Sequence, residues 1–426
     1  MKSFRARYLA ATVGAAAFYV SPAMAQETVP SDTSSPTSST SPTVPNRINA
    51  TFLDLTASVG YSTNPFFEFD NSNGSFFGRA SARGVHSFGN ETGRTSITGF
   101  VEGTTYFNDY GLKSIFQVAA DTQQTVSETV TVFGNAGFSG DLSGQLGNRF
   151  LYTPGQVIVP DPNLPPVPVP VQDPTLFSFA GRQYDLYGQA GASIRTSERG
   201  SITLSGGAQH YFYTSSFLND YTTIFGNAAY NHQLSQRATV GFSVGAHHTE
   251  YSGLSDQSTI INTAATARLL LSESWDLNGS VGVSFSNYDR TVGGNGNATN
   301  LSLDAALCHT SQSERLCGRV ARYTESQSRN SLVTTNSIGI NWFKLIGANQ
   351  TIQLATSYIH YKSNFQILGD TKSDYFDFTG SYSRNFNPRL SGGVDVSYRK
   401  LVQTGPDPDM DLSGSLFVRY RLGDIG

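Results

Sequence analysis

Residues 276–285 read DLNGSVGVSF, and along this stretch two kinds of side chain alternate without a break. One set is apolar or small: Leu277, Gly279, Val281, Val283 and Phe285. The other set is polar or small: Asp276, Asn278, Ser280, Gly282 and Ser284. A period of two is that of a β-strand with one face in an apolar medium and the other in water.

The same alternation recurs along the chain from Thr51 onward, for example in 51–61, 199–214 and 412–422. Each stretch is about 10 to 15 residues long, enough to cross the hydrocarbon of a bilayer as a tilted strand. We therefore predict an all-β fold, a transmembrane antiparallel up-and-down β-barrel of about 18 strands, with 16 strands as the alternative. A soluble β-sandwich or adhesin repeat is the competing fold, but its strands are usually only about 5 to 6 residues long.

The connections between these stretches fall into two classes that alternate along the chain. The short ones are 89–93, 127–129, 197–200, 235–237, 272–274, 311–314, 347–349 and 387–389. The mostly longer ones are 62–75, 108–111, 142–178, 215–220, 252–258, 287–298, 326–331, 363–373 and 403–411. Short periplasmic turns that alternate with longer external loops are typical of outer-membrane barrels. Because the first connection is a long one, we expect both ends of the barrel chain on the periplasmic side.

The composition agrees with a barrel and excludes other classes of protein. Charged residues make up 14% and aromatic residues 12% of the chain, and the net charge is -4. No basic patch interleaved with aromatics is present, so we expect no nucleic-acid partner. Aromatic residues near predicted strand ends fit the two interfacial girdles of a membrane barrel. They are Phe76, Phe107, Phe212, Trp275, Phe285, Trp342 and Phe386.

The N-terminus predicts export. Residues 1–25 combine a basic start, an apolar run over 8–20 and the small residues Ala23 and Ala25, which is the pattern of a cleaved signal peptide. The apolar run is short of the roughly 20 residues that a membrane anchor needs. Residues 26–49 are rich in Ser, Thr and Pro, so we expect a disordered periplasmic segment, as a linker, a tether or a binding segment. Residues 50–426 would then form the barrel, in the outer membrane of a Gram-negative bacterium.

The alternation also predicts which charged side chains face the lumen. We expect lumen-lining positions at Arg79, Arg83, Glu102, Lys113, Asp121, Asp185, Arg195, Arg268, Asp304, Arg319, Asp395, Arg399, Arg419 and Arg421, with Asp276 and Asp377 on the same face. Such charges either line a water-filled bore or pair with one another and narrow it. Both signs are present, so a pore of this kind would show weak ion selectivity.

The longest connection, 142–178, has a centre that reads TPGQVIVPDPNLPPVPVPVQDPT. Proline at this density favours an extended polyproline-like shape and cannot join a strand ladder. The segment would fold inward as a constriction, lie at the external mouth as a recognition surface, or be a tolerated insertion. We favour the external mouth.

Cys308 and Cys317 flank the short turn 311–314 at equal distances, so they lie directly opposite each other across a hairpin. The exported compartment is oxidising, and we predict a structural disulfide between them. We expect no metal site, because His309 adjoins Cys308 without a second spaced pair. The few histidines form no pattern with Ser or Asp that exceeds chance, so we expect neither a cofactor nor an enzyme.

The opening strand ends in Gly60, Tyr61, Asn64 and Phe66. This arrangement resembles the start of the putative outer-membrane β-barrel porins that are encoded with exopolysaccharide gene clusters. The resemblance implies an outer-membrane barrel with a role in the export or surface assembly of polysaccharide, and it covers roughly 51–426. Barrels of this membrane usually end in an aromatic residue that the barrel assembly machinery reads. This chain ends in Gly426, and Tyr420 or Leu422 would have to serve as a displaced signal.

Together these patterns predict passive passage of small solutes, or a conduit linked to surface polysaccharide. The alternative is a non-conducting structural or adhesive barrel that acts through its external loops. Expected partners are outer-membrane lipids, the barrel assembly machinery, and polysaccharide or periplasmic export components.

Overall fold

The computed structural model describes most of the predicted barrel. The described residues are 49–67, 74–90, 92–107, 110–142, 181–215, 218–252, 256–289, 295–327, 331–365, 369–403 and 408–424. The predicted signal peptide (1–25), the Ser/Thr/Pro segment (26–49, except Asn49) and nearly all of the Pro-rich connection (142–178) lie outside the described residues.

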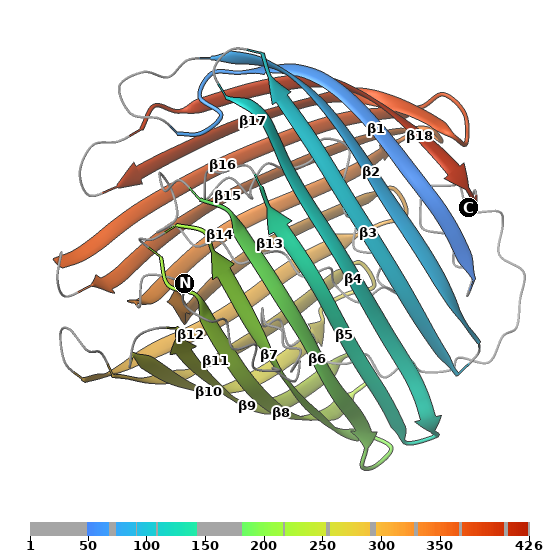
Figure 1. Cartoon of the computed structure of the whole chain (residues 1–426). Helices are drawn as coiled ribbons and strands as arrows, with labels where there is room; N and C mark the ends of the chain where they lie inside the picture. Colours follow the sequence, from blue (N-terminus) through green and yellow to red (C-terminus); the bar gives the residue numbers. More distant parts are fainter. Residues whose placement is uncertain are drawn as a thin grey trace, which may run out of the picture.

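Eighteen strands follow one another in chain order. They are β1 (Ala50–Ser62), β2 (Ser75–Asn90), β3 (Gly93–Tyr106), β4 (Gly111–Ser127), β5 (Val130–Asp141), β6 (Gln183–Arg195), β7 (Gly200–Tyr213), β8 (Tyr221–Ser235), β9 (Ala238–Tyr251), β10 (Gln257–Leu270), β11 (Trp275–Asp289), β12 (Gly296–Thr310), β13 (Glu314–Gln327), β14 (Ser331–Ile346), β15 (Gln350–Phe365), β16 (Gly369–Asn385), β17 (Leu390–Gln403) and β18 (Asp411–Gly423). Each strand pairs antiparallel with its neighbours in sequence, and β18 pairs with β1. The sheet is thus a closed up-and-down barrel whose strands run obliquely around the wall (Figure 1). The predicted fold and the count of 18 strands are confirmed.

Closure depends on the pairing of the first and last strands. Phe52 lies opposite Gly423 and Ser62 lies opposite Ser413, with an unbroken register between them. Eighteen strands spaced about 4.8 Å apart and tilted by about 40° give a backbone radius of roughly 18 Å. We call the rim where β1 begins and β18 ends the terminal rim, and the opposite rim the far rim.

The two faces of the wall differ in chemistry. Val281 and Phe285 point outward from β11 and are exposed, whereas Ser284 between them points inward and is buried. Trp275 and Phe285 mark the two ends of the outward apolar band on this strand. Ten residues at about 3.3 Å each, tilted by about 40°, span about 25 Å, which is the height of the apolar band of a membrane barrel. The outward face therefore lies against lipid.

The short turns lie where the sequence predicts them, at the terminal rim. Two predicted longer connections are wrong in length. For 287–298, β11 continues to Asp289 and β12 begins at Gly296. For 363–373, β15 continues to Phe365 and β16 begins at Gly369. These polar stretches lack an apolar face, but a strand pair that rises above the bilayer needs none, because water surrounds both of its faces. Within the described residues, no helix is both long and apolar enough to cross a membrane.

A pair of adjacent substitutions on β11 tests the assignment of the two faces. Val281→Arg places a charge near the middle of the apolar band and should lower the free energy of unfolding by about 2 to 4 kcal/mol. Ser280→Arg, one residue earlier and on the inward face, should cost much less. Urea unfolding in lipid vesicles measures both values, and equal losses would contradict the assignment.

Candidate functional site in the barrel lumen

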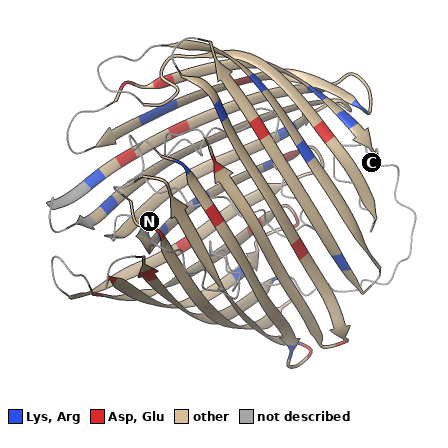
Figure 2. Cartoon of the chain, in the orientation of Figure 1, with Lys and Arg blue, Asp and Glu red and all other residues tan. Residues whose placement is uncertain are grey.

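The strand register places all the predicted lumen residues on one face of the sheet. Asp54 on β1 lies opposite Arg83 on β2 and Arg421 on β18, and the other positions follow by steps of two residues around the wall. This inward face carries Arg79, Arg83, Glu102, Lys113, Asp121, Asp185, Arg195, Arg268, Asp276, Asp304, Arg319, Asp377, Asp395, Arg399, Arg419 and Arg421. Charged positions of both signs are spread thinly over the strands (Figure 2).

Three arginines gather on the inward face toward the terminal rim. Arg421 donates two hydrogen bonds to Asp54, each of 2.7 Å, and its guanidinium stacks 4.4 Å from the centre of the Phe52 ring. Arg83 and Arg419 lie close enough to Asp54 to interact with it electrostatically. Asp54 is not among the residues predicted to line the lumen, although its position between the outward residues Leu53 and Leu55 places it inside.

Other predicted charges are engaged by partners on a neighbouring strand. Arg79 Nε lies 3.4 Å from Glu102 Oε1, and both side chains are buried. Arg319 forms an ion pair with Asp304 on β12. Asp185 accepts a hydrogen bond of 2.7 Å from the side-chain amide of Gln209. Much of the charge in the lumen is thus neutralised locally.

The first connection turns inward at the far rim. Residues 63–67, here called the inward segment, follow β1 directly, and Phe67 N–H donates to Asn64 C=O over 3.3 Å. Pro65 sits at the second position of this turn, where its fixed φ is favourable. Phe67 then adopts a φ of 53°, a left-handed conformation that is uncommon for a residue with a bulky side chain. Such a conformation persists only where surrounding contacts hold it.

A buried ion pair holds the inward segment in place. Arg399 on β17 donates to Asp411 on β18 through Nε at 3.0 Å and through Nη2 at 2.6 Å. The same Nη2 reaches the carbonyl of Pro65 at 3.3 Å. Asp411 Oδ1 also accepts the Ser62 hydroxyl at 2.5 Å and the Asn64 backbone N–H at 3.1 Å. One carboxylate therefore ties the arginine, the strand end and the turn together.

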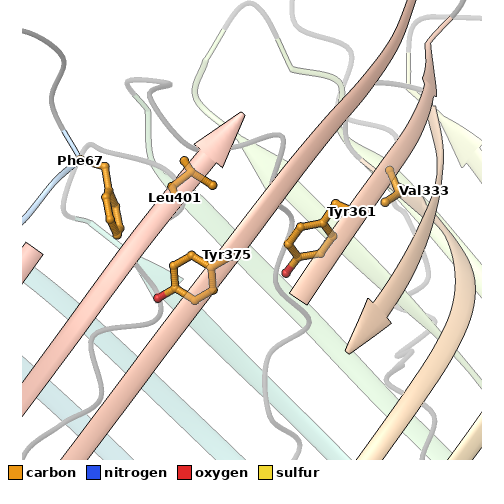
Figure 3. Close-up of a cluster of buried hydrophobic side chains, with 5 residues drawn as sticks. All are labelled: Phe67, Val333, Tyr361, Tyr375 and Leu401. Carbon is orange, nitrogen blue, oxygen red and sulfur yellow. The ribbon is translucent and has the colours of Figure 1, made fainter. Parts of the chain in front are cut away.

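The ring of Phe67 belongs to a buried cluster that includes inward residues of four strands. Its partners in the buried cluster are Val333, Tyr361, Tyr375 and Leu401, from β14 to β17 (Figure 3). The Tyr375 ring lies 6.3 Å away in an edge-on arrangement, and the Arg399 guanidinium lies 5.0 Å from the centre of the Phe67 ring. These contacts account for the left-handed backbone at this residue.

Phe66 turns to the opposite side and packs on β2 and β3. It forms a buried cluster with Phe77 and Tyr106, and its ring lies 4.6 Å from that of Tyr110. The ammonium of Lys113 lies 5.3 Å from the centre of the Phe66 ring. The two phenylalanines thus join the inward segment to two buried clusters, which together include inward residues from β3 round to β14.

The four residues that carry the family resemblance lie in this segment or just before it. A Cβ at Gly60 would collide with the Gly414 carbonyl and the Phe77 ring, so glycine leaves room for the aromatic cluster. Tyr61 points outward against Phe76, with ring centres 5.0 Å apart. Asn64 and Phe66 belong to the inward segment itself. The inward turn of this motif and the roles of Phe67 and Asp411 are not predicted from the sequence.

Cys308 and Cys317 lie directly opposite each other on β12 and β13 and are joined by a disulfide. No group of three or more His, Cys, Asp or Glu side chains in the described part of the chain is placed to hold a metal ion.

No family model and no curated protein sequence matches this chain. Solved structures do show a distant likeness. OccK2 (OpdF) of Pseudomonas aeruginosa is 11% identical with a TM-score of 0.45, over 88% of this chain and 98% of that chain. OpdL of Pseudomonas aeruginosa is 13% identical with a TM-score of 0.45, over 88% and 99%. The ferric citrate transporter FecA in its unliganded form is 9% identical with a TM-score of 0.44, and this chain spans only 60% of its length.

The ion pair that holds the inward segment gives a first prediction for this site. Arg399→Gln leaves the buried Asp411 carboxylate without its cation and should lower the free energy of unfolding by about 3 to 5 kcal/mol. The double variant Arg399→Gln with Asp411→Asn should regain part of that loss, because no unpaired charge remains. Additive losses in this double-mutant cycle would show that the two residues do not interact.

The disulfide gives a second prediction. Cys308→Ser with Cys317→Ser should lower the free energy of unfolding by about 2 to 3 kcal/mol, since the cross-link closes only a short loop. Ala306→Ser with Ala321→Ser is the matched control, because it adds two hydroxyls on the same inward faces of β12 and β13 and leaves the bridge intact. A loss of the whole fold would contradict the modest role assigned to the bridge.

Proposed function

We propose that the chain forms a channel for small polar solutes in the outer membrane of a Gram-negative bacterium, with no enzymatic role. The observation that carries the proposal is the division of the closed wall into an apolar outward face and a polar inward face. A lumen within 18 strands is wide enough for an aqueous path. Diffusion through it needs no cofactor.

The distribution of charge favours solutes with little net charge. The inward faces of β7, β8 and β9 carry Ser, Thr, Asn, Gln, Tyr, small residues, Phe225 and His247, and no Asp, Glu, Lys or Arg within their described positions. On the opposite side, the charges are largely paired. A solute that follows β7 to β9 meets hydrogen-bonding groups rather than a field of one sign, so ion selectivity is weak.

A link to surface polysaccharide is a finer proposal. It is supported by the resemblance of Gly60, Tyr61, Asn64 and Phe66 to the opening of the exopolysaccharide-associated porins. The second candidate function is a non-conducting barrel that acts through its external loops. The inward segment favours this candidate, because it packs against the inner wall and narrows the far mouth.

Single-channel recording from the full-length protein in a planar bilayer tests the proposed channel. Discrete conductance steps with weak selectivity are expected. Arg419→Glu should shift the reversal potential toward cations, because the arginine lies on the inward face. Arg384→Glu is the matched control, since this exposed arginine faces outward on β16 and should leave the reversal potential unchanged.

Silence in the bilayer would refute the channel if the same material is folded, as shown by a gel mobility that changes on heating. The non-conducting barrel would then be the better reading. An equal shift for Arg384→Glu and Arg419→Glu would contradict the assignment of Arg419 to the lumen.

A further inference from the structure

The wall is not paired along its full height between β12 and β13. Their register runs only from Leu303 opposite Arg322 to Thr310 opposite Arg315. Residues 296–302 of β12 continue as a strand that pairs with β11 alone, and residues 323–327 of β13 pair with β14 alone. Toward the far rim, the described sheet therefore divides into two flaps, β10–β12 and β13–β14, and the second flap stays paired with β15 through Val333, Thr334 and Thr335.

The β13–β14 flap passes inside the other one. We call residues 323–327 of β13 and 331–335 of β14 the tip. Ser326 lies on the outward face of the tip, yet its hydroxyl is 2.6 Å from the hydroxyl of Ser258, which lies on the inward face of β10. An outward side chain of β13 can meet an inward side chain of β10 only if the tip lies inside the wall.

Burial supports the same geometry. Leu332 points outward from the tip and is 3% exposed, whereas Leu301 points outward from β12 and is 55% exposed. Ile260 on the inward face of β10 is also 3% exposed. On the other side of the tip, Val333 belongs to the same buried cluster as Phe67 (Figure 3). The tip is thus covered on both faces, and it adds to the narrowing of the far mouth.

Arg322 occupies the point where the flaps separate. Its Nε donates to the Leu301 carbonyl at 3.2 Å, and its Nη1 donates to Asn336 Oδ1 at 2.8 Å. The Cα atoms of Cys308 and Cys317 are 4.1 Å apart, which is typical of a non-hydrogen-bonded pair. By alternation, Leu301 opposite Thr324 would be a hydrogen-bonded pair. The guanidinium therefore takes the carbonyl that the backbone N–H of Thr324 would use in a continued ladder.

We propose that the tip is a gate with two states. In the closed state, which we call lapped, the tip lies inside the wall. In the open state, which we call zipped, β13 of the tip forms backbone hydrogen bonds with β12. Continuing the register from Leu303 and Arg322 places Ser302 opposite Tyr323, Leu301 opposite Thr324, and Asn300 opposite Glu325. In the open state, Thr324 replaces Arg322 at the Leu301 carbonyl, and Ser326 leaves Ser258. The far mouth widens as the tip joins the wall. The consequence for conductance rests on the proposed channel function, but the change of pairing does not.

Two opposing contributions keep the lapped and zipped states close in free energy. Leu301 lies opposite the outward Val283, so the unpaired edge of β12 reaches into the apolar band. Unpaired backbone groups in lipid cost several kcal/mol each, and this favours zipping. The buried contacts of the tip with β10 and with the Phe67 cluster favour the lapped state. Arg322 lowers the cost of that state by satisfying one carbonyl.

Two engineered cysteine pairs, each added to the full-length protein, test the gate. Ser258→Cys with Ser326→Cys should form a disulfide that holds the lapped state. Asn300→Cys with Glu325→Cys should form one that holds the zipped state. The side chains of the second pair face the lumen. In the continued register they form a non-hydrogen-bonded pair, as Cys308 and Cys317 do, so the native bridge serves as the internal standard. Peptide mapping by mass spectrometry after mild oxidation in membranes reports each yield.

The proposal expects both introduced disulfides to form, and Arg322→Gln to raise the yield of the 300–325 bridge. Single-cysteine variants control for cross-links between molecules. If the 258–326 bridge forms while the 300–325 bridge stays absent, the tip does not reach β12 and the gate is overturned. If only the 300–325 bridge forms, the lapped state is overturned instead.

Conductance measurements then test the proposed gate and the proposed channel function separately. The oxidised 258–326 variant should conduct less than after reduction, and the oxidised 300–325 variant should conduct more than after reduction. The parent protein given the same reductant controls for loss of the native bridge. Equal conductance in both locked forms of a conducting barrel would overturn the gate. Both bridges forming in a silent barrel would support the change of pairing and refute the channel.

Discussion

The structure depends on one constraint, the need to pair every backbone N–H and C=O group that lies in lipid. An unpaired group in hydrocarbon costs several kcal/mol, so a sheet edge that is open along its whole length is not stable there. The pairing of β1 with β18 closes the barrel, and β12 and β13 part from each other only toward the far rim. Once the barrel is closed, each strand has one face in lipid and one in the lumen. The alternation of residues in 276–285 follows directly from that division.

The same constraint explains where the wall departs from regularity. Above the bilayer, water can satisfy the backbone, so the chain is free to turn inward at the far rim. The inward segment uses this freedom, and Asp411 satisfies the turn with a carboxylate rather than with a strand partner. Burying Arg399 beside Asp411 is favourable only because their geometry is good and additional hydrogen bonds are formed. Where β12 and β13 separate, the Arg322 side chain binds the Leu301 carbonyl, which the backbone of β13 would bind if the ladder continued.

The period-two pattern made the fold, the strand count and the inward positions predictable. Those features follow from the alternation of apolar and polar residues, and the short turns follow from Gly, Ser and Asn between strands. Asp54 was predictable in the same way, because Leu53 and Leu55 flank it. Asp411 was hidden because it lies at the edge of a polar connection. The inward turn of Phe67 and the lapped tip left no periodic signal, since alternation says which face a residue occupies and not which distant surface that face meets.

Thiol accessibility along β11 tests the central claim, a wall with lipid on one side and water on the other. Single cysteines at positions 276–281, 283 and 285 would be labelled in intact membranes with a small charged thiol reagent, and separately with a fluorophore that lipid-bound quenchers reach. Gly282, where a Cβ would meet the backbone of β10, and the buried Ser284 are left unchanged. We expect the labelling to alternate, with 276, 278 and 280 reached from water and 277, 279, 281, 283 and 285 quenched from lipid. Uniform labelling by the charged reagent at all eight positions would contradict this division.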